Sequence, residues 1–593
     1  MTSRRRGVVT MVLTALLGGS VVVSPAAQAA APSDEAVFVN VHTLTFNDAL
    51  VRPDQVVIVR HGRIVAMGSR TQVPVPEQAR VIDGRGGYLL PGLVDGHVHL
   101  DGDGTRVGTS RSDFGDGPLY LAHGVTSVIN MHGLPEHLDW RARVERGDLV
   151  GPTIYTAGEF VNEPRVITPD DVEREIEAQR AAGYDLIKFR EVYSRELGSL
   201  TTTGLSLETY LHMNDVARRL GMPLVGHEPA NLGLEPVLQA GQALAHLGGL
   251  SSIYFLPMLN YPVWLVVTAL AVCALTAIAI ANGLMAIVHR WRVLPSPPRA
   301  VSRVRELAGL QLLAAAIAAA SAILFLPGGP AFESAALRWV FTVMLICVAG
   351  ATTALVYTMV RIWSEPDTSR AARVQAVVAS VAGVALAWAA FAFWVPVIWR
   401  SSDRGMAIVA DRLRDAGVIV ETTLVAYDAL GGVGRRELLA DPAIDYLHPE
   451  VQARWRRLRG TAPRMRYRHF MQKLARVLHE HGVTLLVGTD AMGYPLVAPG
   501  ASLQRELELL VGSGLTPYDV LYAATVEPAR FLQRPHEFGR LAPGLRADLL
   551  LVEANPLDDI TYLRDPVGVM ARGRWFPREE LHRMLGQLAS TVE

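Results

Sequence analysis

At 593 residues the chain is longer than one ordinary domain, so we expect two or more structural units. Its 56 lysine and arginine residues nearly balance its 57 aspartate and glutamate residues, and the net charge of −1 excludes a global basic field for nucleic acid. With only two cysteines, Cys273 and Cys347, a disulfide framework and a cysteine-rich metal site are excluded as well.

The N-terminus has the composition of an export signal. Arg4, Arg5 and Arg6 precede the apolar run GVVTMVLTALLGGSVVV, and the small residues AQA at 27–29 suit a signal peptidase. We expect residues 1–30 to form a signal peptide, with an uncleaved membrane anchor as the alternative. Both interpretations send the residues that follow across the membrane.

Short β-like runs occupy both ends of the remaining chain. The N-terminal end contains AVFVNVHTL, and the C-terminal end contains GLRADLLLVEANP and VGVMARGRWF, with turn residues such as Asn and Gly between the runs. We expect residues 36–90 and 541–576 to form one small β-sandwich.

Between these ends, short apolar runs alternate with helix-like segments. GVTSVIN, LIKF, MPLVGHE, VIVETTL and VTLLVGTDA are strand-like, whereas PDDVEREIEAQRAAG and LETYLHMNDVARRLG are helix-like. This alternation predicts an α/β fold, a TIM-type (β/α)8 barrel formed by residues 91–252 and 403–540. Such a barrel carries its chemistry at the carboxyl ends of its strands.

Metal-binding side chains stand at or near the ends of these predicted strands. His97 and His99 close PGLVDGHVHL, and because residues i and i+2 of a strand point to one side, both imidazoles can reach one ion. Four histidines and an aspartate suit zinc or a similar divalent ion. The full candidate set is His97, His99, Lys188, His227, His246 and Asp490.

Four long uncharged stretches interrupt the predicted barrel in a chain that is 50% hydrophobic, with a mean hydropathy of +0.23. Each has at least the ~20 residues that a helix needs to cross the hydrocarbon core, so residues 253–402 are predicted to form a four-helix transmembrane insert. The stretches run from Tyr261 to Val288, from Leu307 to Leu326, from Trp339 to Val360 and from Val374 to Trp399.

Arginines in the connections of this insert predict its orientation. The first and third connections are expected in the cytoplasm, because positive charge is retained on that side, and both halves of the barrel are then outside. We therefore expect a multi-pass protein of the cytoplasmic membrane with an extracytoplasmic catalytic domain. The first connection carries Arg290, Arg292, Arg299, Arg303 and Arg305, the third carries Arg361, Arg370 and Arg373, and the second has only Arg338.

In their order and spacing, these motifs resemble the amidohydrolase superfamily, in particular its imidazolonepropionase-like and prolidase-like branch. PGLVDGHVHL resembles the family's strand-1 metal motif, and GYDLIKF resembles its strand-4 lysine motif. GMPLVGH and AGQALAHLGG resemble the histidine motifs of strands 5 and 6, and GVTLLVGTDA resembles the aspartate motif of strand 8. The resemblance extends to the C-terminal helix and closing strands, and it covers roughly residues 36–252 and 403–576.

The resemblance implies one or two divalent ions, with zinc as the first candidate, and a role for each residue. The two strand-1 histidines would bind the more buried ion, and His227 and His246 would bind the second. Lys188 would carry a carboxyl group on its amine and bridge the two ions; an unmodified lysine beside a single ion is the alternative. Asp490 would contact the first ion and act as general base and acid for water.

Three further residues are candidates for contact with substrate. His132 follows the second strand of the predicted barrel, and Glu191 and Tyr193 follow Lys188. In the SL-x-REL segment, where many relatives carry a histidine, this chain has Gln504. If that histidine positions substrate in the family, the preference of this protein has shifted.

The expected function is hydrolysis of a C–N bond, in an amide, a dipeptide or a cyclic amide, at the outer face of the cytoplasmic membrane. Ester or lactone hydrolysis at the same site is one alternative, and a membrane-tethered metal sensor or transport accessory is another. The insert follows His246 on the catalytic rim, where loops set substrate choice. It either presents the site to amphipathic substrates at the lipid bilayer or tethers an enzyme for soluble small molecules and short peptides.

Overall fold

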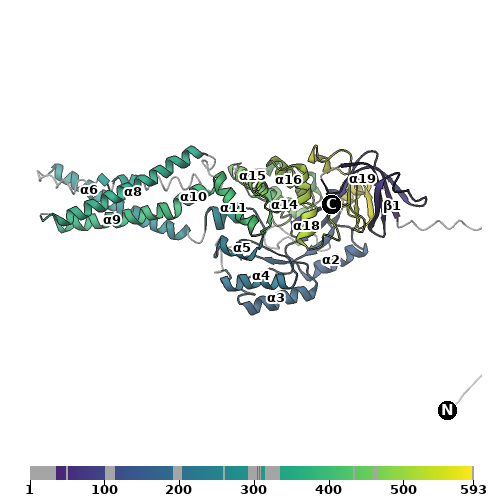
Figure 1. Ribbon diagram of the computed structural model, residues 1–593, viewed down its shortest axis with the longest axis horizontal. Helices are drawn as coiled ribbons and strands as arrows, with labels where there is room; N and C mark the ends of the chain where they lie inside the picture. The colour runs from purple at the N-terminus through teal and green to yellow at the C-terminus, as the bar shows by residue number, and fades with distance from the viewer. Residues whose placement is uncertain are drawn as a thin grey trace, which may run out of the picture.

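The computed structural model describes residues 35–48, 51–100, 114–190, 204–257, 261–291, 304, 306–307, 309–313, 334–366, 368–431, 435–458 and 465–590. Along the long axis of the molecule lie a helical bundle, a central α/β body and a β-sheet (Figure 1). The expected signal peptide (1–30) falls outside the described residues, and so do Glu191 and Tyr193.

Among the described residues, strands from both ends of the chain form one eight-stranded sheet in the order β16-β15-β14-β5-β1-β2-β3, with β4 beside β1. Strands from both ends of the chain are therefore hydrogen-bonded into one sheet. The strands are β1 (Glu35–Leu44), β2 (Val51–Arg60), β3 (Arg63–Ser69), β4 (Arg80–Asp83), β5 (Tyr88–Pro91), β14 (Leu549–Val552), β15 (Gly568–Ala571) and β16 (Arg574–Pro577).

This terminal sheet folds back on itself. Phe38 on β1 and Trp575 on β16 are four strand positions apart, a separation of about 19 Å in a flat sheet with ~4.8 Å between strands. Their ring centroids nevertheless lie 5.2 Å apart, in edge-to-face contact. The two halves of the sheet thus enclose a common apolar cluster.

In the described part of the chain, eight short parallel strands form the central body. Regular ladders join β6, β7 and β8 in one sheet and β9 to β13 in another. Isolated bridges join Ala157 to Leu186 and Val98 to Ala491 at the two junctions, so the regular ladder is not continuous around the body. The strands are β6 (Leu93–Val98), β7 (Val125–Asn130), β8 (Thr153–Thr156), β9 (Ile187–Phe189), β10 (Leu224–Gly226), β11 (Ala243–Leu244), β12 (Val420–Glu421) and β13 (Leu485–Leu486).

Helices connect and cover these strands. Side-chain caps fix where several of them begin: Thr168 accepts a hydrogen bond from the backbone of Asp171 in α3, and Ser402 accepts one from Gly405 in α11. The helices are α1 (Gly117–Ala122), α2 (Pro135–Arg146), α3 (Pro169–Ala182), α4 (Leu207–Arg219), α5 (Leu234–Ala240), α11 (Asp403–Asp415), α12 (Leu424–Gly431), α13 (Arg435–Leu439), α14 (Pro449–Arg457), α15 (Met465–Glu480), α16 (Ala501–Gly512), α17 (Pro517–Ala523), α18 (Val526–Phe531) and α19 (Arg578–Ser590), with the short turns η1 (Ser251–Phe255), η3 (Pro442–Tyr446) and η4 (Ile560–Leu563).

The predicted insert forms the helical bundle. It contains α6 (Tyr261–Trp291), α8 (Ala335–Ser364), α9 (Arg370–Ala389), η2 (Ala390–Trp394) and α10 (Val395–Arg400). By length and hydropathy, three described segments are candidates to cross a membrane: Pro262–Ala281, Ala335–Ser364 and Arg370–Arg400. The predicted span from Leu307 to Leu326 lies mostly outside the described residues.

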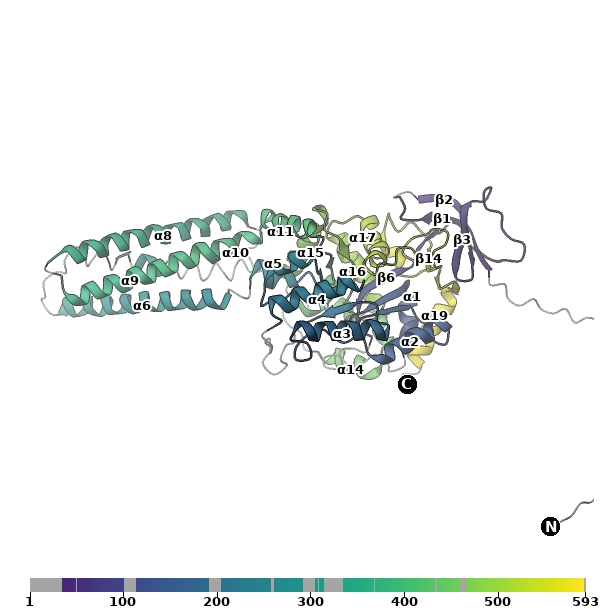
Figure 2. The ribbon, with the colours of Figure 1, turned by 60° about the horizontal axis from the view of Figure 1, so that its bottom comes forward.

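The bundle and the terminal sheet lie at opposite ends of the molecule (Figure 2). The bundle is inserted between β11 and β12, so the chain leaves the body after the carboxyl end of β11 and returns through α11. This connection belongs to the end of the strands where a parallel barrel carries its site.

Candidate functional site

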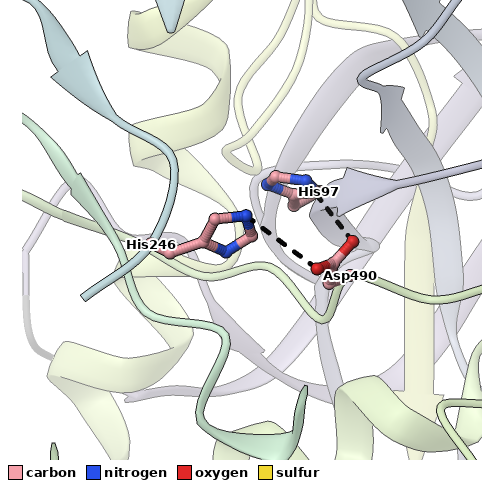
Figure 3. A group of neighbouring side chains, drawn as sticks. All are labelled: His97, His246 and Asp490. Carbon is pink, nitrogen blue, oxygen red and sulfur yellow. Dashed lines mark ion pairs between the residues drawn. The ribbon is translucent and has the colours of Figure 1, made fainter. Parts of the chain in front are cut away.

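The six predicted ligands converge at the carboxyl ends of five strands. His97 and His99 come from β6, and Lys188 lies within β9, whereas the other three follow the ends of β10, β11 and β13. Ligand atoms of His97, His246 and Asp490 all lie within 4.8 Å of one another (Figure 3). A small cavity beside them is lined by His99, Phe160, Lys188, Arg190, His227, His246, Asp490, Gly493 and Tyr494.

The Asp490 carboxylate occupies the centre of this cluster. Its Oδ1 atom lies 3.2 Å from Nε2 of His99 and 3.6 Å from Nε2 of His97, while its Oδ2 atom lies 3.9 Å from Nε2 of His246. Burial alone would raise the pKa of Asp490, but the hydrogen bond from His99 and the charges of His246 and Lys188 lower it to about 2. Asp490 is therefore ionised at neutral pH.

The donor set fits a divalent metal ion. Nε2 of His97 and Nζ of Lys188 are both buried without a hydrogen-bond partner. Buried polar atoms are nearly always hydrogen-bonded, so two such atoms in one cluster call for another partner. Imidazole nitrogens and a carboxylate oxygen are the ligands that zinc prefers.

Lowered pKa values favour the neutral, metal-binding form of three histidines, His97, His227 and His246. Burial and the positive charge of Lys188 lower the pKa of both His97 and His227 well below the usual value. Burial also lowers the pKa of His246 to about 3, although Asp490 opposes this shift. A neutral imidazole offers a lone pair without first releasing a proton, which favours metal binding at neutral pH.

Lys188 is one of only two lysines in the chain, the other being Lys473. Its side chain is buried, and burial lowers its pKa from 10.5 to about 8, while Glu421 and Asp490 oppose the shift. Arginine supplies nearly all other basic side chains, yet its guanidinium stays protonated in proteins. At the one basic position inside the cluster, the chain has an amine that is partly neutral near physiological pH.

Glu421, at the end of β12, is a site residue that the sequence did not single out. Its Oε2 atom lies 2.6 Å from Nδ1 of His97, and both side chains are fully buried. Burial raises the pKa of Glu421 well above the usual range, and the nearby Lys188 opposes this effect. As a carboxylate, Glu421 would accept the Nδ1 proton of His97 and leave Nε2 free to face Asp490. The sequence indicates this residue only by one acidic side chain in the strand-like run VIVET. Glu421 ends its strand, as the other candidate ligands lie at or near the ends of theirs.

Small residues and a buried carboxylate bring β6 and β13 into close contact. Asp95 accepts hydrogen bonds from Oγ1 (2.7 Å) and the backbone nitrogen (3.0 Å) of Thr489, which ties the two strand ends together. A Cβ atom on Gly493 would come within 2.7 Å of Cδ2 of His99 and closer still to Oδ1 of Asp490. Only glycine therefore fits against the cluster at position 493.

Comparisons with known proteins concern the family and the fold. The sequence profile of the amidohydrolase family matches residues 407–576. Solved structures share the fold: a putative prolidase from Bifidobacterium longum has a TM-score of 0.51 at 17% identity, covering 94% of this chain and 100% of its own, and a bottromycin amidohydrolase has a TM-score of 0.53 at 20% identity, covering 94% and 91%. The comparisons support the amidohydrolase superfamily. They also imply a TIM-type barrel for the α/β body.

Curated relatives match shorter segments. An adenine deaminase of Lysinibacillus sphaericus is 27% identical over 29% of this chain and 29% of its own length. A deacetylase of Agrobacterium fabrum is 28% identical over 31% and 46%, and an imidazolonepropionase of Ralstonia nicotianae is 29% identical over 29% and 34%. The chain thus spans less than half the length of these relatives. The expected enzyme class, hydrolysis of C–N bonds, is the class of the amidohydrolase family and of these relatives.

The remaining candidates lie around the amidohydrolase-like site in different ways. The ring of His132 contacts that of Phe160, with 4.5 Å between centroids, and Phe160 rather than His132 lines the cavity. The Arg190 guanidinium lies over the ring of Phe160, 5.2 Å from its centroid. Arg190 also lines the cavity. Gln504 donates a hydrogen bond of 2.8 Å to the His123 carbonyl and is not among the described residues of the cavity wall.

Proposed function

We propose that this protein is a metal-dependent amidohydrolase that cleaves a C–N bond, in an amide, a dipeptide or a cyclic amide, at the outer face of the cytoplasmic membrane. The observation that carries this proposal is the cluster of His97, His246 and Asp490, whose ligand atoms all lie within 4.8 Å of one another, with the buried Nε2 of His97 lacking a hydrogen-bond partner. The amidohydrolase profile match over residues 407–576 supports the reaction class.

His97, His99 and Asp490 would hold one ion, and His227, His246 and Lys188 would complete a second position. When bound, a divalent metal, with zinc as our first candidate, lowers the pKa of water toward ~7 and polarises a carbonyl group. Glu421 orients His97 through the contact between Oε2 and Nδ1, which directs the other ring nitrogen toward Asp490.

Asp490 is the proton carrier in this proposal. Its carboxylate is ionised at neutral pH and lies among three imidazoles, so it can accept a proton from the attacking water. The same proton then passes to the nitrogen of the leaving group as the C–N bond breaks. The products are a carboxylic acid and a neutral amine, and when the substrate is a cyclic amide these are the two ends of one ring-opened molecule.

Lys188 would be carboxylated on Nζ. The neutral amine attacks carbon dioxide, a new N–C bond forms, and one proton is released to water. A pKa of about 8 leaves roughly a tenth of the side chain neutral at pH 7, whereas an ordinary lysine would be almost entirely protonated. The carbamate would supply the anionic oxygens that a protonated lysine lacks.

The location of the site at a membrane is part of the proposal. Three described helices have the length and hydropathy of membrane spans, and large apolar side chains such as Leu270, Val381 and Trp388 are exposed on them. Helices of this kind bury their outer faces in lipid. Arginines in the first and third connections support an outward-facing body.

The substitution Asp490→Asn tests the proposal. We expect the metal-loaded wild-type protein to hydrolyse at least one substrate class in a screen of N-acyl amino acids, dipeptides and lactones. The variant should lose at least about 100-fold in rate, because general acid–base catalysis contributes 10²–10⁴-fold. Metal content should persist in the variant, and the exposed Asp415→Asn on α11 serves as the matched control. A variant that hydrolyses substrate at the wild-type rate would refute the proposal, whereas cleavage of lactones alone would favour the ester-hydrolase alternative.

A further inference from the structure

The two segments of the body that flank the membrane insert meet at the candidate metal site. The chain enters the insert after His246 and returns to the body before Thr423, and these two side chains contact each other. Nδ1 of His246 lies 3.0 Å from Oγ1 of Thr423 across a gap of 177 residues. The insert therefore interrupts the chain between two residues of the candidate site.

The first connection between body and bundle is firmly packed. Phe255, at the end of η1, contacts Phe470 of α15 edge to face, with 5.0 Å between ring centroids. The neighbouring Tyr254 donates a hydrogen bond of 2.8 Å to the Gly405 carbonyl of α11. The segment that leads into α6 is thus held against two helices of the body.

The returning segment closes this arrangement from the other side. Nη1 of Arg400 donates a hydrogen bond of 2.9 Å to the Tyr254 carbonyl, and its guanidinium lies 5.3 Å from the centroid of the Tyr254 ring. Arg338, at the start of α8, donates a hydrogen bond of 3.2 Å to the carbonyl of Ser401. We call the contact between Tyr254 and Arg400 the neck clamp; it fixes the exit and the return of the insert against each other.

Aromatic side chains gather on the bundle directly beside the neck clamp. Trp339 and Trp399 contact each other with 5.0 Å between ring centroids, and Trp264 contacts Phe393 at 6.2 Å. Tryptophan is enriched where helices pass from lipid to water. Because Trp399 immediately precedes Arg400, the boundary of the bilayer is expected at the neck clamp itself.

A tether for a soluble-substrate enzyme needs none of this rigidity. A flexible linker would retain the body at the membrane, and it would leave the site open to water from every direction. Here the rim that carries the ligands is fixed toward the bundle, and the terminal sheet lies at the far end of the molecule (Figure 2). An active-site rim held in one orientation toward the bilayer favours substrates that reside in the bilayer.

We propose that the site takes amphipathic amides from the outer leaflet, with the apolar chain retained among the lipids and the scissile C–N bond at the metal cluster. This inference rests on the proposed function. The cavity wall contributes Arg190, whose positive charge suits a substrate with a carboxylate at its polar end. Long-chain N-acyl amino acids have both features.

The experiment compares N-acetyl and N-dodecanoyl derivatives of a mixed set of amino acids, hydrolysed by the full chain in proteoliposomes. We expect kcat/KM to be at least about tenfold higher for the dodecanoyl series, because partition into the bilayer raises the local substrate concentration. The variant Arg400→Ala loosens the neck clamp without altering a ligand. It should lower the ratio of dodecanoyl to acetyl hydrolysis at least about threefold and leave acetyl hydrolysis unchanged.

Arg373→Ala is the matched control at the far end of the bundle. Like Arg400, Arg373 lies over an aromatic ring, 5.9 Å from the centroid of the Trp363 ring, and it donates a hydrogen bond of 3.1 Å to the Glu365 carbonyl. This variant should keep the wild-type ratio. Acetyl substrates cleaved as fast as dodecanoyl ones, or a ratio unaffected by Arg400→Ala, would overturn the inference while leaving the proposed function intact. Hydrolysis of neither series by a metal-loaded protein that cleaves a dipeptide or a cyclic amide would overturn the inference alone, whereas a protein that cleaves none of these substrates would overturn the proposed function as well.

Discussion

Nδ1 of His97 lies 2.6 Å from the Glu421 carboxylate, deep in the body and across 324 residues of sequence. Every residue of the membrane insert lies between these two positions. The contact therefore joins the first strand of the body to the strand that follows the insert. It also orients the predicted metal ligand His97, because Glu421 contacts Nδ1 while Nε2 faces Asp490.

The substitution Glu421→Gln keeps the shape of the side chain and removes its charge. We expect metal affinity to fall about 10–100-fold, because an outer carboxylate orients a ligating histidine and raises its basicity. The measurement is the dissociation constant for zinc by chelator competition. Glu450→Gln, an exposed change on α14, is the control. If Glu421→Gln bound zinc as tightly as wild type, Glu421 would have no part in positioning His97.

Gly493 is the second position where a small change should disturb the site. The added methyl of Gly493→Ala would collide with His99 and with Oδ1 of Asp490, so these side chains must move apart. We expect at least about tenfold weaker metal binding, with the fold retained, since a 1 Å displacement at a site can cost 10²-fold.

Gly512→Ala provides a matched control for that change. A Cβ atom added to Gly512 would have Nε2 of Gln472 as its nearest neighbour, at 3.9 Å, and the residue is exposed at the end of α16. Circular dichroism and zinc titration together separate misfolding from a local effect. Unchanged zinc binding by folded Gly493→Ala would contradict the described contact between Gly493 and the cluster.

Much of the site could be predicted because its residues lie in short continuous motifs. His97 and His99 share one strand, and Asp490 follows an apolar run, so local sequence places each at a strand end. Glu421 could not be assigned in this way, since a lone acid becomes meaningful only when the fold brings its side chain at the end of β12 into contact with His97 of β6.

The fold was predictable to a similar degree. Alternating runs indicate parallel strands and helices, and uncharged stretches of sufficient length indicate the bundle. The contact of Arg400 with Tyr254 was not predictable, because it depends on how two distant segments pack. The same holds for Phe160, which reaches the cavity from a loop that has no ligand motif.

Carboxylation of Lys188 should depend on pH in a defined direction. Only the neutral amine reacts with carbon dioxide, and with a pKa of about 8 its fraction rises from roughly a tenth at pH 7 to roughly nine-tenths at pH 9. We expect ¹³C-labelled bicarbonate to give a single carbamate resonance in the NMR spectrum, which grows over this range. Since the chain has only two lysines, Lys188→Met should abolish the signal and Lys473→Met should retain it. A signal that persists in Lys188→Met would assign the modification elsewhere.

The orientation of the bundle can be tested with single cysteines in a background of Cys273→Ala and Cys347→Ala. Ser364→Cys lies at the exposed end of α8, just before the connection to α9, and Glu450→Cys lies on the surface of the body. An impermeant maleimide should label position 450 in intact cells and position 364 only after lysis, because the arginines beside this connection favour the cytoplasm. Labelling at both positions in intact cells would reverse the assignment for this connection.

The central claim, that this cluster hydrolyses a C–N bond with a bound metal, is tested most directly by titrating metal into chelated protein. Amide hydrolysis should be absent without metal and should rise in proportion to bound zinc until the site is filled. The titration of Asp490→Asn, continued to a zinc concentration that offsets the loss of one ligand, should fill the site without restoring turnover. Hydrolysis that is equally fast in the chelated protein, or a fully loaded wild-type protein that cleaves no amide, dipeptide or cyclic amide, would contradict the account.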